Sequence, residues 1–203
     1  FNYTKNEMIK TSTLLDFTLG INELNYVKSI HIVAVNNEVK EILWILEKDF
    51  LDEISVKTVN ILKESLITFD FLLSDEKNYS SEYSILLSYL YEPNAAILKA
   101  GAFNIITKHL EVFKLQKNSQ LYTSQKLIDF PCRPFKIEEV LPYNMKAIKK
   151  IGLKKANITT RNFPESVQQL RKKLDIKDGG EKYLFFTKDK EENRIVIITS
   201  KVL

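Results

Sequence analysis

One stretch constrains the fold more than any other, the segment ANITTRNFPESVQQLRKKLDIKDGG at residues 156–180. At its start, Ile158 and Thr160 alternate with Thr159 and Arg161, which is the two-residue period of a half-buried strand. Pro164 should end this strand because it has no N–H to give to a ladder, and it suits the first position of a helix. The segment therefore predicts a strand over 156–161.

A helix is expected to follow directly. Val167, Leu170 and Leu174 are spaced to form one apolar stripe, and the two glycines at 179–180 suit the turn that closes the unit. The predicted strand and the predicted helix over 164–174 together indicate a small α/β module.

The same alternation continues on both sides of this unit. From residue 134 onward we expect strands at 135–141, 183–187 and 195–202 and a basic helix at 144–151. Before it, the polar stretch 75–81 is the expected domain boundary, followed by a strand at 84–91, a helix at 95–110 and a short return strand at 120–123.

The first 74 residues predict a different pattern. Residues 29–35 form a continuous apolar run, typical of a strand buried on both faces of a parallel sheet. We expect short helices at 7–20 and 38–50, and two hairpin strands at 54–61 and 66–73.

Several long strings resemble one protein family. ANITTRNFP, GG-x-x-YLF, YLYEPNAAILKAGAF and QLYTS resemble the C-terminal region of Bacteroidetes-type class I S-adenosylmethionine-dependent methyltransferases, and MIKTSTLLD resembles a segment of their methyltransferase domain. The resemblance implies an α/β fold with three parts. They are the C-terminal third of a Rossmann-like methyltransferase sheet (1–74), a ferredoxin-like unit (75–132) and a THUMP-like domain (133–203).

The cofactor-binding half of such an enzyme is not expected in this chain. The chain has five glycines and none of them forms a G-x-G, the element that lets a backbone approach a cofactor. We therefore expect S-adenosylmethionine to bind the parent protein and not this chain alone, and no catalytic residue can be named. Residues 1–74 would then need the missing half, or a second copy, to cover them.

Composition excludes several other classes. The chain is 44% hydrophobic and 28% charged, ordinary for a globular protein, and has no apolar run near the roughly 20 residues that span a membrane. The single cysteine, Cys132, cannot form an internal disulfide, which favours the cytoplasm. His31 and His109 have no neighbours at metal-ligand spacing, so no metal site is expected.

Positive charge is concentrated in one region. Residues 133–177 hold 12 Lys/Arg against 4 Asp/Glu, whereas residues 1–132 are net acidic. Such a cluster suits the phosphates of structured RNA, tRNA or rRNA, although lysines also simply solvate helix faces. The candidate RNA-binding residues are Arg133, Lys149, Lys150, Lys154, Lys155, Arg161, Asn162, Phe163, Arg171 and Lys172.

Two of these predictions have a structural alternative. Arg161 and Phe163 could stack on an unpaired base, but Phe163 could instead pack onto the following helix. A second cluster, Tyr91, Glu92 and Asn94, could bind a small polar ligand or a base edge, or could simply end a strand and cap a helix.

The basic cluster and the resemblance together predict that this chain is the RNA-binding C-terminal portion of a methyltransferase, and that this portion alone is inactive. The alternative is a protein-interaction or dimerisation module of a methyltransferase that acts on something other than RNA.

Overall fold

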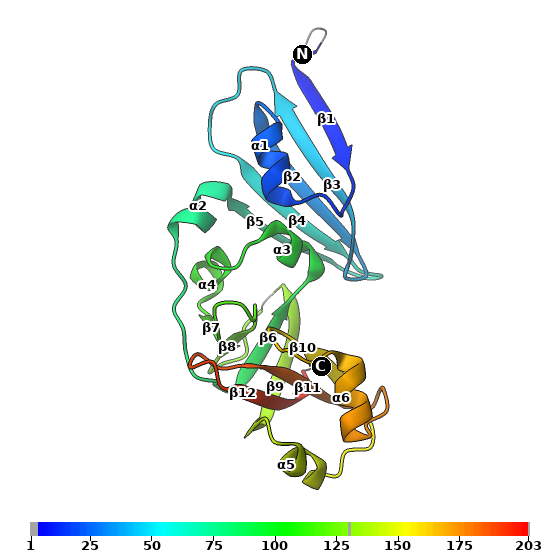
Figure 1. Ribbon diagram of the computed structural model, residues 1–203. Coiled ribbons are helices and arrows are strands. Elements are labelled where there is room, and N and C mark those ends of the chain that lie inside the picture. Colours follow the sequence, from blue (N-terminus) through cyan, green and yellow to red (C-terminus); the bar gives the residue numbers. More distant parts are fainter. Residues whose placement is uncertain (1–3, 130, 203) are drawn as a thin grey trace. The chain divides into compact units, whose positions relative to one another are not determined.

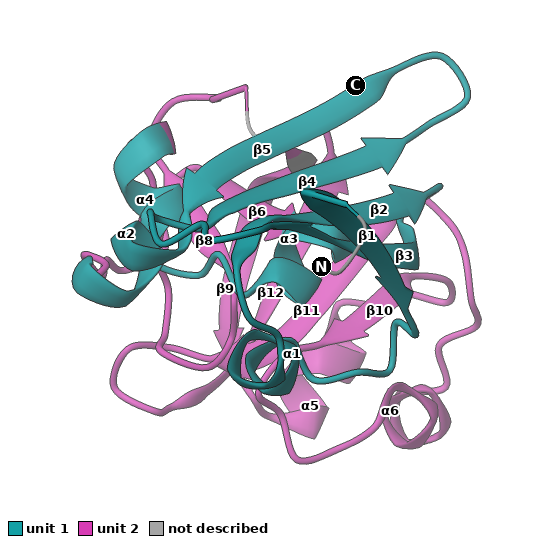
Figure 2. Ribbon diagram, turned by 90° about the horizontal axis from the view of Figure 1, so that it is seen from above, with its two compact units in different colours: residues 1–80, 93–109 teal, residues 81–92, 110–203 magenta. Residues whose placement is uncertain are grey.

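The computed structural model describes residues 4–129 and 131–202 of the chain, which forms two compact units (Figures 1 and 2). Unit 1 comprises residues 1–80 and 93–109, and unit 2 comprises residues 81–92 and 110–203. The chain therefore passes between the units three times, because a short segment after β6 returns to unit 1.

Unit 1 is built on a five-stranded mixed sheet with the order β1-β3-β2-β4-β5. Neighbouring strands are antiparallel except β2 and β4, which run parallel. The strands are β1 (Asn6–Thr11), β2 (Val27–Val35), β3 (Glu38–Glu47), β4 (Ser55–Ile61) and β5 (Leu66–Leu72). The expected strands at 29–35, 54–61 and 66–73 are confirmed as strands, but β2 lies in a mixed sheet and its burial alternates from Ile30 onward, unlike the strand of a parallel sheet with both faces buried that its apolar run predicted.

The helix expected at 38–50 is wrong, because this segment is strand β3. Ile42, Trp44 and Leu46 are buried while their neighbours are more exposed, which is the period of a strand. Asn36 and Asn37 both have positive φ, 49° and 64°, the geometry of the two-residue turn that joins hairpin strands. The Asn-Asn pair is thus a hairpin turn and not a helix cap.

The helix expected at 7–20 is also wrong. Its first half is strand β1, and the helix α1 (Phe17–Glu23) begins later, where the Asp16 carboxylate accepts hydrogen bonds from the backbone N–H groups of Thr18 and Leu19 at 2.8 and 3.2 Å. This cap fixes the start of the helix. Gly20 therefore lies inside α1 and does not end it.

Three more short helices belong to unit 1: α2 (Leu73–Asn78), α3 (Ala95–Ala100) and α4 (Ile105–Leu110). The single helix expected at 95–110 is divided because Gly101 adopts φ 71° and ends α3. Asn94 caps the start of α3 through a bond from Ile97 N at 3.1 Å, and α3 packs against β2, β3 and β4.

Unit 2 contains a seven-stranded sheet with the order β10-β11-β12-β9-β6-β8-β7. Its strands are β6 (Tyr89–Pro93), β7 (Phe113–Lys114), β8 (Tyr122–Ser124), β9 (Cys132–Pro142), β10 (Asn157–Thr160), β11 (Lys182–Lys188) and β12 (Arg194–Lys201). Two helices accompany it, α5 (Met145–Lys150) and α6 (Val167–Leu174). The alternation expected from residue 134 onward is confirmed.

Helix α6 starts later than expected. Ser166 caps it and Gln169 bonds back to the Ser166 N–H at 2.8 Å, so Pro164 lies in the preceding turn. The strand expected at 84–91 is likewise shifted, to β6.

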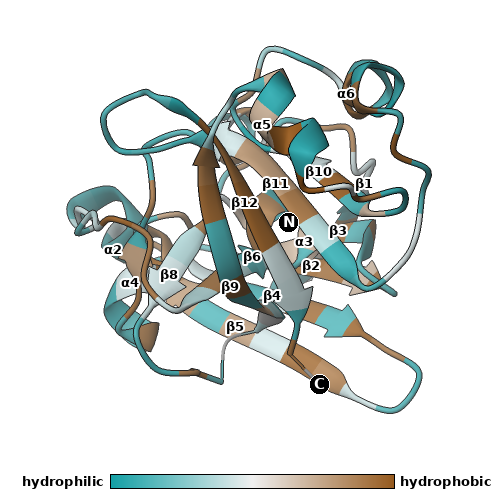
Figure 3. Ribbon diagram, turned by 90° about the horizontal axis from the view of Figure 1, so that it is seen from below, coloured by the Kyte–Doolittle hydropathy of each residue, from teal (hydrophilic) through white to brown (hydrophobic). Residues whose placement is uncertain are grey.

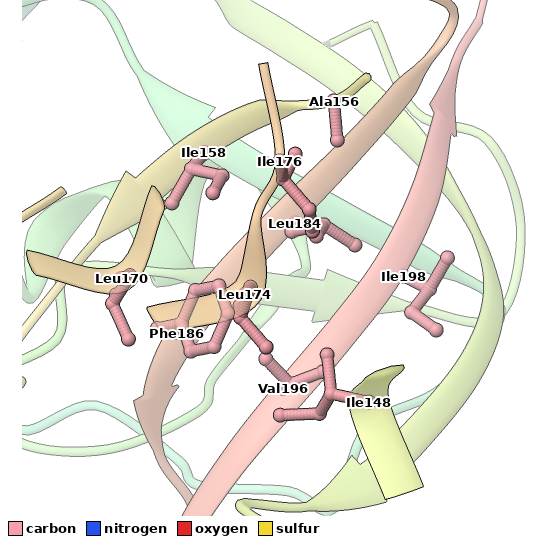
Figure 4. Packing of buried hydrophobic residues seen from close by; sticks show 10 residues of the cluster. All are labelled: Ile148, Ala156, Ile158, Leu170, Leu174, Ile176, Leu184, Phe186, Val196 and Ile198. Atoms are coloured by element: carbon pink, nitrogen blue, oxygen red, sulfur yellow. The ribbon is translucent and has the colours of Figure 1, made fainter. Parts of the chain in front are cut away.

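Both faces of β11 and β12 are buried, which explains their continuous apolar runs (Figure 3). On one face Leu184, Phe186 and Val196 pack against residues of α5 and α6 (Figure 4). On the other face Phe185 and Ile197 pack with Phe135 of β9. The core of unit 2 therefore has two layers of side chains, one on each side of the sheet.

The sheet of unit 2 is strongly curled. Strands β10 and β7 stand at opposite ends of the strand order, yet Asn162, just after β10, donates from Nδ2 to Gln116 Oε1, just after β7, at 3.0 Å. The curl brings the end of β10 to the β6–β7 region and decides which candidate site residues meet.

Candidate nucleic-acid interface

Four lysines lie around one turn of unit 2. Lys149 and Lys150 occupy the last turn of α5, and Lys154 and Lys155 lie in the loop that leads to β10. All four are exposed, and Gly152 between the pairs has φ 77°, a conformation that favours glycine. Within the described residues no carboxylate pairs with any of them. We call these four residues the lysine turn.

The basic residues of α6 are mostly engaged within the protein. The Arg171 guanidinium donates to the carbonyl oxygens of Ala156 and Ile176 at 3.2 and 3.4 Å and pairs with Asp178. Lys173 pairs with Glu165. Lys172 is exposed and, in the part of the chain that the structure describes, has no ion-pair partner.

Two predicted RNA-binding arginines meet the glutamate of the other predicted cluster. Arg161 Nη2 lies 2.8 Å from Glu92 Oε1, and Arg133 Nη2 pairs with Glu92 Oε2. The Glu92 side chain is only 3% exposed, against 33% for Arg161 and 49% for Arg133. Because a buried carboxylate is costly without partners, the two arginines offset its charge, while part of each arginine side chain remains exposed; we call these three residues the arginine–glutamate clasp.

Asn162 and Phe163 are also held by the fold. Asn162 has φ 51° and bonds to Gln116, and the Phe163 ring packs edge-on against Tyr143 and Phe186 with centroids 5.0 and 5.7 Å away. These ring partners lie before α5 and on β11, whereas the structural alternative for Phe163 was packing onto the helix that follows it. Neither side chain belongs to the lysine turn.

The three residues of the expected ligand cluster are buried in two different units. The Tyr91 hydroxyl contacts Ser124 Oγ at 2.8 Å and accepts a bond from Ile128 N at 2.9 Å within unit 2. Asn94 caps α3 in unit 1, and Glu92 belongs to the clasp. Each side chain is therefore bound within its own unit.

A titratable pair anchors the start of α6. Burial, and the hydrogen bond that the hydroxyl donates to Glu165 Oε1 at 2.5 Å, raise the pKa of Tyr143 to about 12. The Lys173 ammonium and the Tyr143 hydroxyl hold the pKa of the Glu165 carboxyl below its usual value. This pair was not predicted, because only the fold brings Tyr143 and Glu165 together.

Both histidines belong to unit 1. Burial and the Lys57 ammonium lower the pKa of His31, whose Nε2 lies 3.0 Å from Ser29 Oγ, and the His109 ring packs against Phe69. No group of three His, Cys, Asp or Glu in the described residues could hold a metal ion. The Cys132 side chain lies outside what the structure describes, and none of the described helices is long and apolar enough to cross a membrane.

Comparisons with known proteins agree with the resemblance in its coarser form. Residues 132–201 match the family model of a THUMP domain-like region, and residues 89–131 match that of a ferredoxin-like domain. No curated protein matches the chain.

One solved structure is similar over nearly the whole chain. It is the crystal structure of a "putative methyltransferase" from Porphyromonas gingivalis W83, with a TM-score of 0.92 and 32% sequence identity. The match covers 98% of this chain and 52% of that one, so this chain spans about half the length of that protein. The chain thus contains a ferredoxin-like region followed by a THUMP-like domain.

Proposed function

We propose that this chain is the C-terminal, RNA-holding portion of an S-adenosylmethionine-dependent methyltransferase of class I. The observation that carries the proposal is the lysine turn on the THUMP-like domain, four exposed ammonium groups that no described carboxylate neutralises. Clusters of this kind meet the phosphates of structured RNA without reading its bases. The candidate RNA is tRNA or rRNA.

In this proposal residues 1–74 contribute the end of the methyltransferase sheet, and they are followed along the chain by a ferredoxin-like unit (75–132) and the THUMP-like domain (133–203). The hairpin of β4 and β5, antiparallel at the edge of the sheet, is compatible with such an end. The missing half of the parent protein, or a second copy of this chain, would cover unit 1.

The residues of this chain do not fit S-adenosylmethionine. None of its glycines forms the G-x-G that lets a backbone approach the cofactor, and the positive-φ glycines lie at helix ends and loops of α3, α5 and α6. The cofactor would therefore be held by the other half of the parent enzyme. The part left to this chain is to hold the RNA at a fixed place, and positioning is a large contribution to any group transfer.

The first experiment measures the affinity of the chain for bulk tRNA by fluorescence anisotropy over a range of salt concentrations. We expect Kd to rise steeply with salt, and the Lys154→Gln/Lys155→Gln variant to bind at least several-fold more weakly with a shallower salt slope. The matched control is Lys48→Gln/Lys63→Gln, which removes the same charge from exposed sites of unit 1.

If both double variants lose the same amount of affinity for tRNA, binding depends on the total charge of the chain and not on the lysine turn. Absence of salt-sensitive binding by the wild type would overturn the proposal.

A protein-interaction role is the second candidate, favoured by one observation. Strand β5 lies at one end of the unit 1 sheet, and its residues Leu66 and Leu72 are 61% and 39% exposed. An exposed apolar edge strand is a ready surface for another chain. Sedimentation that gives a salt-insensitive dimer, lost on Leu66→Lys, would support this role.

A further inference from the structure

A small pocket lies next to the lysine turn in unit 2. It has a volume of about 230 Å³ and is formed by α5, the loop after it and the end of α6. Its apolar wall consists of Ile148, Leu153, Leu174 and Ile176, and its polar rim consists of Lys149, Lys154 and Asp175. Figure 4 shows Ile148, Leu174 and Ile176 within the cluster that packs on β11 and β12.

The backbone on both sides of the pocket adopts left-handed turns. Gly152 has φ 77°, and a Cβ built there would meet nothing within 4 Å. Asp175 has φ 56° and is the residue that ends α6. The pocket mouth is thus bordered by two tight turns, and its base is the packed core of unit 2.

The size and lining of the pocket select one kind of occupant. Ligand pockets for drug-sized molecules usually reach about 300–1,000 Å³, so this one suits a single ring system. The aliphatic side chains of the pocket can pack against the flat face that every nucleobase has. The ammonium groups of Lys149 and Lys154, which line the pocket, would pair with the phosphates on either side of such a base.

The carboxylate of Asp175 adds a preference among bases. A carboxylate accepts a hydrogen bond from an amino group such as N4 of cytosine, whereas uracil offers only a carbonyl at that position. The Asp175 carboxylate repels the phosphates of RNA unless a hydrogen bond offsets the repulsion. A base with an amino group can donate that hydrogen bond, so the carboxylate favours such a base.

We propose that this pocket receives one unpaired nucleobase of the bound RNA, preferentially one that carries an exocyclic amino group. The inference rests on the proposed RNA-holding function and deepens it. The lysine turn supplies affinity for any phosphate backbone, and the pocket supplies a preference for unpaired over duplex RNA.

The test compares the affinities of the chain for a labelled oligocytidine, an oligouridine of equal length and an RNA duplex. We expect the wild type to bind oligocytidine several-fold more tightly than oligouridine. Leu153→Ser should weaken single-strand binding by about tenfold, the scale of one lost apolar contact, and leave duplex binding and its salt slope within about twofold. Leu127→Ser, an exposed leucine of unit 2 outside the pocket, is the matched control.

A second variant keeps the test independent of folding defects. Asp175→Asn keeps a residue type that tolerates positive φ, and thermal unfolding will verify that the variant is folded. We expect it to abolish the preference for oligocytidine over oligouridine without weakening overall binding, because a negative charge is removed.

The outcomes separate the two proposals. Salt-sensitive binding with equal affinity for single strand and duplex, or equal loss on both ligands in Leu153→Ser, overturns the pocket and leaves the RNA-holding function intact. Absence of binding to all three ligands overturns both.

Discussion

At the scale of single residues, a buried carboxylate decides what two arginines do. Glu92 is nearly inaccessible, and both of its oxygens accept bonds from guanidinium groups that reach it from the start of β9 and the end of β10. Both arginines were predicted to bind RNA, and the structure shows that each first balances this charge. The arginines of the clasp therefore first neutralise Glu92, whereas the lysine turn is the group that we propose to bind RNA phosphates.

The first residue-scale prediction concerns the clasp. Breaking a buried ion pair costs roughly 3–5 kcal/mol, and since the two arginines are partly exposed we expect Glu92→Gln to lower the free energy of unfolding by about 2 kcal/mol. Urea unfolding measures the change. Glu181→Gln, at an exposed site, should leave stability nearly unaltered, and a Glu92→Gln protein as stable as this control would contradict the role of the clasp.

The second residue-scale prediction concerns Tyr143, whose pKa is raised to about 12. A raised folded-state pKa contributes stability that is present below the unfolded value of about 10 and is lost as the pH rises through the folded value. We therefore expect ultraviolet titration of the nine tyrosines to show a late phenolate phase that Tyr143→Phe removes. Tyr83→Phe, at an exposed tyrosine, should retain that phase; identical curves for wild type and Tyr143→Phe would disprove the assignment.

At the scale of elements, α1 is fitted to β3 through one glycine. A Cβ at Gly20 would lie 2.4 Å from ring atoms of the fully buried Trp44, whose Nε1 donates to Thr11 Oγ1 at 2.9 Å. Because the Trp44 indole is fully buried and hydrogen-bonded to Thr11, moving it away from a new methyl group would cost free energy. This contact explains why a helix carries a glycine in its interior.

Gly20→Ala should accordingly be destabilising. Overpacking costs about 1–3 kcal/mol, and alanine gains roughly 1 kcal/mol in a helix, so we expect the free energy of unfolding to fall by up to about 2 kcal/mol. Gly101 is the control position, because it has φ 71° and no atom lies within 4 Å of the place that a Cβ would take. Asparagine, which tolerates positive φ, should therefore be tolerated at position 101 and not at position 20. A Gly20→Ala protein more stable than wild type would show that Trp44 yields.

At the scale of the whole molecule, the boundaries of the two compact units differ from those of the three expected domains, because residues 93–109 belong to unit 1. Helices α3 and α4 follow the ferredoxin-like strand β6 in sequence but belong to unit 1, where Ala96, Ile97 and Ala100 are buried. Packing of α3 against β2 and β4 gives the physical reason. Unit 1 is therefore incomplete at residue 80.

This division predicts how fragments behave. A fragment of residues 1–80, which ends at the expected boundary, should lack cooperative thermal unfolding because the face of β2 and β4 that α3 covers is exposed to water. A fragment of residues 1–109 restores α3 and α4 and should unfold cooperatively by circular dichroism. Cooperative unfolding of the shorter fragment would show that α3 is dispensable for unit 1.

The sequence by itself determined the elements whose signals are local. The strand–helix alternation of unit 2, the hairpin of β4 and β5 and the excess of positive charge after residue 132 all follow from patterns a few residues long. It missed β3, because its apolar positions suited a helix as well as a strand and the Asn-Asn turn was taken for a helix cap.

Only the tertiary structure decided which basic residues remain available to a ligand. The sequence pattern does not distinguish the three arginines of the candidate set from its lysines. The curl of the sheet brings Arg133 and Arg161 to Glu92. Arg171 instead donates hydrogen bonds to the backbone carbonyls of Ala156 and Ile176. The two contacts with Glu92 join residues 41 and 69 positions apart, and no local period in the sequence indicates them. Among the described residues, no carboxylate forms an ion pair with any of the four ammonium groups of the lysine turn.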